Sequence, residues 1–207
     1  MNMNNLFYLS SLMLALTSFT VLNTTTSDKN TSSIHNTVVG GSKAGFIKEE
    51  DAENIPWAAR RILSWEDFQS APQLGTEAVA STSTSLGLSY QLRSGVLTYE
   101  ITCNFSKPKS WGSLKTDYIL AHEQGHFDIT EIHARKLYKA LADLQFNRHT
   151  YKEDINAIYQ QIVKEKEEMQ ETYDQESDHS RNHKVQSEWF TKIDNMLTDT
   201  EAYATYP

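Results

Sequence analysis

Three residues, His122, Glu123 and His126, have types and a spacing that could perform metal-dependent hydrolysis. On an α-helix, residues four apart lie on one face, so both imidazoles can reach one Zn²⁺ at roughly 2.0–2.1 Å. Zinc brings the pKa of water from about 15.7 to near neutrality, and a neighbouring carboxylate can accept the proton as the water attacks a carbonyl. The pattern therefore predicts a zinc-activated water with Glu123 as its general base.

The sequence around this motif predicts a helix that positions it. No proline occurs between Tyr118 and Asn147, and Gly125 is the only glycine there. Apolar and histidine positions recur at steps of three and four, the period of a helix face, at Ile119, His122, His126, Ile129, His133, Leu137, Ala140 and Leu144. A buried imidazole without a partner costs roughly 1–3 kcal/mol. One metal ion would satisfy both motif histidines; the alternative is two core histidines bonded to backbone or carboxylates.

The third zinc ligand must come from outside the motif, because a catalytic zinc usually has three protein ligands and an open position. His133 is on the same helix face but lies about 10 Å along the helix from His126, too far for one ion. We predict His179, in a polar break between two later helices, because an antiparallel return helix would bring it level with the zinc. The other candidates are His183, His149, Glu171 and Asp174.

The remaining elements indicate an α+β fold. Alternating apolar residues over 86–92 and 97–105, separated by the turn at 93–95, predict a β-hairpin with one buried face. Apolar residues at helical spacing predict one helix from about 153 to 174 and a last one over 185–196. We therefore expect a small N-terminal antiparallel sheet or hairpin packed against a long zinc-motif helix and further C-terminal helices.

The N-terminal part of the chain is predicted to direct export. Residues 1–22 contain an apolar stretch followed by a polar tract, which is typical of a secretory signal peptide, with an uncleaved anchor as the alternative. Residues 23–45, rich in Thr, Ser, Asn and Gly, are expected to be a flexible polar tether. Residues 46–207 are expected to form a single metallohydrolase-like domain. The working protein is then secreted or periplasmic.

Composition narrows the function further. The formal net charge of the 207 residues is −8, which argues against a nucleic-acid partner because phosphates require a basic footprint. Cys103 is the only cysteine, so the chain forms no intramolecular disulfide.

The motif region resembles a bacterial family of unknown function whose members are described as predicted secreted zinc-dependent proteases. The resemblance lies in residues 120–137 and covers about residues 60–195. Its other elements are Trp65-Glu66-Asp67-Phe68, Ser110-Trp111, Tyr173-Asp174, His179, Gln186 and Trp189. It implies an α+β fold with the motif helix packed on a small sheet. Ser177 and Ser180 stand where the family pattern has Thr and Gly around His179.

The expected function is a secreted zinc-dependent metallohydrolase, specifically a metallopeptidase that acts on a peptide or protein. Its zinc ligands would be His122, His126 and His179, and its catalytic base Glu123. The hairpin edge could bind an extended peptide by strand addition, and Tyr173 could hold the oxyanion. The alternative is a non-enzymatic exported protein that binds zinc or a partner, whose structural metal site would be closed by four protein ligands.

Overall fold

The computed structural model describes residues 50–207. The expected signal peptide at 1–22 and the tether at 23–45 lie outside these residues. Within 50–207, none of the helices combines the length and the apolar character that a membrane span needs.

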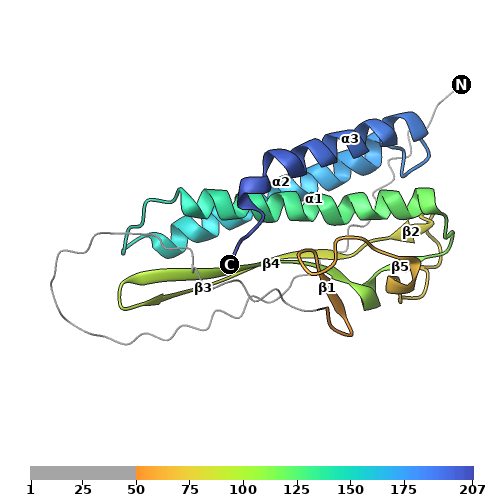
Figure 1. Ribbon diagram of the computed structural model, residues 1–207. Coiled ribbons are helices and arrows are strands. Elements are labelled where there is room, and N and C mark those ends of the chain that lie inside the picture. The colour runs from red at the N-terminus through yellow and green to blue at the C-terminus, as the bar shows by residue number, and fades with distance from the viewer. Residues whose placement is uncertain (1–49) are drawn as a thin grey trace, which may run out of the picture. The chain divides into compact units, whose positions relative to one another are not determined.

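Two small antiparallel sheets form the β part of the fold (Figure 1). In the larger sheet β4 (Val96–Ser106) lies between β1 (Asn54–Pro56) and β3 (Thr84–Arg93). The smaller sheet pairs β2 (Ala80–Ser81) with β5 (Trp111–Gly112). Short 3-10 helices occur at Trp65–Asp67, Lys107–Lys109 and Glu201–Tyr203.

The predicted β-hairpin is confirmed as β3 and β4. Arg93 pairs with Val96, so the connection is a two-residue turn at Ser94 and Gly95, whose φ angles are 49° and 80°. Positive φ at both positions is the geometry that matches the twist of the flanking strands. The alternating apolar residues of the hairpin face the core, namely Leu86, Leu88, Leu97, Tyr99, Ile101, Cys103 and Phe105.

Three helices follow the sheets, namely α1 (Asp117–Ala142), α2 (Tyr151–Glu176) and α3 (His183–Asp199). The side chain of Thr116 caps α1 by accepting a hydrogen bond from the backbone N–H of Ile119. The helix ends at Ala142, five residues before Asn147, to which we expected the helix to run. Asn147 instead bonds the backbone of His149 in the connecting turn, a local bond by which asparagine competes with helix formation.

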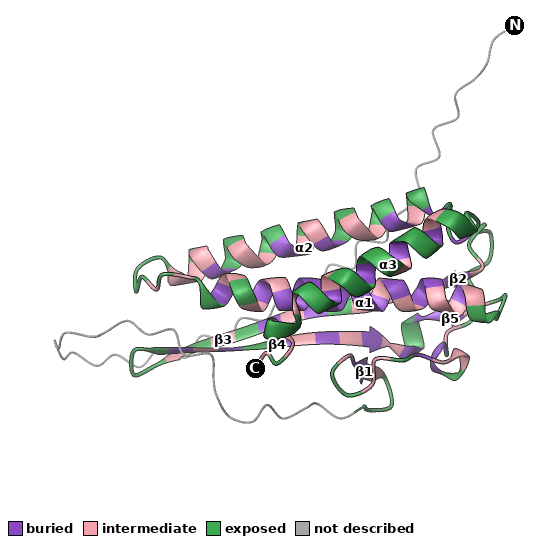
Figure 2. Ribbon diagram, turned by 45° about the horizontal axis from the view of Figure 1, so that its top comes forward, coloured by how far each residue is buried: buried purple, intermediate pink, exposed green. Residues whose placement is uncertain are grey.

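Helix α1 lies between the sheet and the pair α2 and α3, and Figures 1 and 2 show this order of layers from two directions. Every residue from Phe127 to Arg135 is buried. The sequence predicted one buried face of this helix. The buried surface of α1 is wider than that face, because residues all round its central turns are buried. The α+β class is confirmed, with α1 as the central element.

Candidate metal centre

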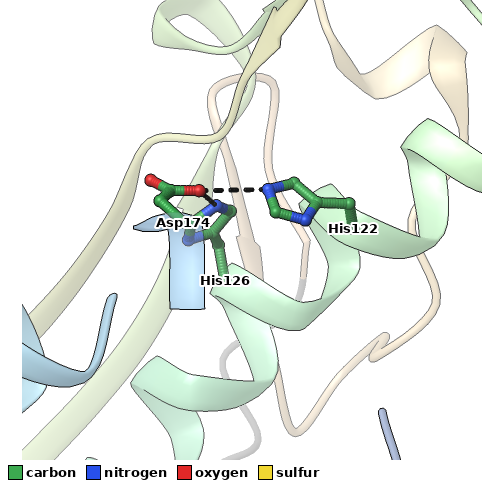
Figure 3. A group of neighbouring side chains, drawn as sticks. All are labelled: His122, His126 and Asp174. Carbon is green, nitrogen blue, oxygen red and sulfur yellow. Dashed lines mark hydrogen bonds and ion pairs between the residues drawn. The ribbon is translucent and has the colours of Figure 1, made fainter. Parts of the chain in front are cut away.

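His122, His126 and Asp174 come together where α2 runs back along α1 (Figure 3). The Nε2 atoms of His122 and His126 each lie 3.1 Å from Oδ1 of Asp174. One donor atom from each of the three residues lies within 4.8 Å of the other two. Donors bound to one zinc ion at 2.0–2.1 Å in a tetrahedron are roughly 3.3 Å apart. The three residues therefore form a candidate metal site, which we call the metal group.

Gly125 allows α2 to approach α1 closely enough to form this group. A Cβ at Gly125 would lie 2.6 Å from the Tyr173 hydroxyl oxygen, a distance that would force the helices apart. The Tyr173 hydroxyl donates a hydrogen bond to the carbonyl of His122, and its ring stacks on the His122 ring with centroids 4.5 Å apart. Tyr173 is fully buried, so its role is helix packing, and it does not fit the oxyanion role considered from the sequence.

Two glutamines hold the histidine rings of the metal group. Oε1 of Gln170 contacts Nδ1 of His126, and its Nε2 donates to the His126 carbonyl. Oε1 of Gln186 lies 3.1 Å from Nδ1 of His122, and its Nε2 donates to the Tyr118 carbonyl. Because each amide nitrogen already faces a backbone acceptor, each amide oxygen must accept from a ring Nδ1–H. Nε2 is then the ring atom with a free lone pair, which is the arrangement that orients histidine for a metal.

The two histidine rings of the metal group face more hydrogen-bond acceptors than neutral imidazoles have N–H groups to donate. The two rings make four contacts with oxygen acceptors, but a neutral imidazole has only one N–H. Burial lowers the pKa of His126, but the hydrogen bond and the charge of Asp174 outweigh it and raise this pKa to about 9. Burial raises the pKa of Asp174, but its hydrogen bonds with His122 and His126 hold it well below its ordinary range. A divalent cation bound between the three residues would also compensate for this shortage of N–H donors.

Glu123 supplies a carboxylate beside the metal group. The residue is 4 % exposed, and its Oε2 is buried without a hydrogen-bond partner among residues 50–207. Its negative charge also contributes to the raised pKa of His126. No donor among residues 50–207 contacts this oxygen, so its lone pairs are free to accept a hydrogen bond.

Asp174 stands in the position that we expected His179 to take. Asp174 is still within α2, so its side chain faces α1, whereas His179 follows the end of the helix. Nδ1 of His179 lies 3.8 Å from Oδ1 of Asp174, and His179 is not part of the metal group. Of the other candidates, His183 stacks on Tyr118 with ring centroids 3.9 Å apart. Glu171 and His149 are likewise outside the metal group.

The two glutamines were not predicted as functional residues from the sequence. Gln170 is four residues before Asp174, so both lie on one face of α2, and this spacing was the available signal. Gln186 entered only through the family resemblance. Its contact with His122 depends on how α3 packs.

Residues 47–180 match the model of a family described as "Bacterial protein of unknown function (DUF922)". The match covers more than half of the chain, which therefore belongs to this family. It includes the metal group, Glu123 and His179, and it ends before α3, so Gln186 and Trp189 lie outside it. No curated protein and no solved structure matches the chain significantly.

Proposed function

We propose that this DUF922 member is a zinc-dependent hydrolase with peptides as its substrate class. The observation that carries the proposal is the buried, unpartnered Oε2 of Glu123 beside the metal group. The apolar stretch within residues 1–22 supports the accompanying proposal that the protein works outside the cytoplasm.

Nε2 of His122, Nε2 of His126 and Oδ1 of Asp174 would hold the zinc ion. Two imidazoles and one carboxylate are a donor set that catalytic zinc sites use. Zinc bound there would lower the pKa of water and polarise a carbonyl group. Gln170 and Gln186 keep the two rings in the required orientation, as partners of metal-bound histidines do.

Glu123 would move the proton during hydrolysis. Its Oε2 can accept a proton from the attacking water and deliver it to the nitrogen of the leaving amine. Access is from the Asp174 side, where that side chain is 31 % exposed and His126 is 14 % exposed. Three protein ligands with an opening to solvent favour a catalytic centre over a structural one.

The second candidate function is a structural zinc site in a protein without enzymatic activity. It is favoured by the position of His179, whose Nδ1 is 3.8 Å from Asp174 Oδ1 and could become a fourth ligand. Four protein ligands would close the site.

The decisive experiment compares the wild type with Glu123→Gln. Both should contain about one zinc per chain by metal analysis. Cleavage of a mixed peptide library should fall by roughly 10²–10⁴-fold in Glu123→Gln, because an amide cannot accept the proton. Glu171→Gln is the matched control, since Glu171 is exposed on α2 and outside the metal group.

A wild-type protein that is folded, metal-free and insensitive to chelators would refute the zinc proposal. Unchanged turnover in Glu123→Gln would refute the role of Glu123. Loss of zinc in that variant would make Glu123 a ligand instead.

A further inference from the structure

Three consecutive residues after α2 have left-handed backbone conformations. The φ angles are 50° for Asp178, 50° for His179 and 72° for Ser180. This conformation is unfavourable for residues other than glycine, because their Cβ comes too close to the following carbonyl oxygen. Strain of this kind persists only where the surrounding structure imposes it, and it concentrates at functional sites.

Hydrogen bonds tie this strained turn to the C-terminal end of α2, the helix that carries Asp174. The backbone N–H of His179 donates to the carbonyl of Asp174 at 2.8 Å, and that of Asn182 donates to the carbonyl of Ser177 at 2.8 Å. The hydroxyl of Ser177 in turn donates to the carbonyl of Tyr173. The backbone of His179 is thereby tied to the residue that carries the candidate carboxylate ligand.

The His179 ring differs from the two rings of the metal group. Its side chain is 63 % exposed, against 5 % for His122 and 14 % for His126. Within residues 50–207 the ring has no hydrogen-bond partner, whereas a glutamine oxygen faces Nδ1 of each of the other two rings. Histidines that bind metals almost always have such a partner. His179 therefore lacks a feature of a ligand, although it lies at the exposed side of the centre.

We infer that His179 is a second catalytic residue, which donates a ring N–H hydrogen bond to the carbonyl oxygen of the substrate. The inference rests on the proposed function. It makes the His179 ring, at the exposed side of the site, the group that recognises the acyl oxygen of the substrate. As the water oxygen bonds to the carbonyl carbon, the C=O π electrons move to the carbonyl oxygen. Glu123 accepts the water proton and returns it to the amine nitrogen as the C–N bond breaks. A hydrogen bond aimed at the oxygen where charge develops stabilises the transition state.

The test compares two variants of the full-length chain, His179→Ala and His183→Ala. His183 is the matched control, because it is an exposed histidine only four residues further on. We expect both variants to bind Zn²⁺ within about threefold of the wild type in competition with a chromophoric chelator. Acetohydroxamate, which presents an acyl oxygen to the metal, should bind the Co²⁺-loaded His179→Ala protein about tenfold more weakly or worse. His183→Ala should bind it like the wild type. His179→Gln, which retains an N–H donor, should recover part of this affinity.

Peptide turnover supplies the second readout. His179→Ala should lower kcat by roughly 10²–10³-fold with little change in KM, as for loss of one oxyanion donor. Loss of zinc affinity by orders of magnitude in His179→Ala would make His179 a ligand and overturn the inference. Wild-type acetohydroxamate affinity in His179→Ala would overturn it as well. A wild type that binds zinc and acetohydroxamate but cleaves no peptide refutes the proposed peptidase function instead, so the two failures are distinguishable.

Discussion

Helix α1 contributes to two polar clusters that differ in how their charges are balanced. In the first, which we call the charge network, Arg61 and Trp57 donate to Asp128, and Arg135 pairs with Glu131 at 2.9 Å. The second is the metal group with Glu123.

Every carboxylate oxygen of Glu131 in the charge network has a donor. Oε1 accepts from Arg135, and Oε2 accepts from the hydroxyl of Tyr206 at 2.7 Å. Arg135 also donates to the carbonyl of Leu197. The metal group instead has four ring contacts for two neutral imidazole protons, and Oε2 of Glu123 has no described partner. In the charge network the protein itself supplies the hydrogen-bond donors of the Glu131 carboxylate. In the metal group a bound cation would supply the positive charge that is missing.

The largest expected effect is on the charge network. Arg135→Met should lower the free energy of unfolding by about 3–5 kcal/mol, because it leaves the buried carboxylate of Glu131 without its cation. Urea denaturation measures this. Lys184→Met is the control, since the Lys184–Glu188 pair is exposed and such pairs contribute at most about 1 kcal/mol. Zinc loss from folded Arg135→Met would show that the two clusters are coupled.

The next effect is the pH dependence of the metal-free protein. The pKa of His126 is raised from 6.5 to about 9, so its stabilisation is complete below pH 6.5 and is lost as the pH rises through 9. Burial lowers the pKa of His133 to about 4. Between pH 6.5 and 4 the unfolded chain therefore takes up a proton that folded His133 does not, and stability falls.

These two histidines should give a stability maximum near pH 6.5 in urea titrations of the metal-free protein. The difference between the stability curves of the wild type and His126→Ala should show the loss of stability at alkaline pH. The difference between the wild type and His133→Gln should show the loss at acid pH. Zinc competes with the proton on His126, so zinc affinity should rise by up to about tenfold per pH unit towards pH 9. A zinc affinity independent of pH would contradict the assignment of His126.

The smallest expected effect comes from the glutamine that holds His126. Gln170→Ala should weaken zinc binding by about 10–100-fold with all three ligands retained, because the ring loses the partner that orients it. Gln161→Ala is the matched control, since Gln161 is exposed on the same helix and its side chain donates a hydrogen bond to Glu165, outside the metal group. Equal zinc affinities of the two variants in chelator competition would show that Gln170 does not support the site.

The sequence alone was sufficient for features that depend on local periodicity. The hairpin followed from alternating residues and the Ser94-Gly95 turn, and α2 and α3 followed from apolar positions at helical spacing. The pair His122 and His126 was predictable because four residues return a helix to the same face. The antiparallel return of α2 followed from its length and the short connection.

The tertiary structure decided which residue joins the two histidines and which residues hold them. Each residue along α2 turns the side-chain direction by about 100°, so the choice between Asp174 and His179 depends on the rotation of α2 against α1 and on where α2 ends. Gly125 leaves the space in which Tyr173, the residue before Asp174, packs against α1. Gln186 reaches His122 only because α3 packs beside α1. Spacing along the chain fixes distances within a helix, whereas distances between helices are fixed by side-chain packing, which no sequence period records.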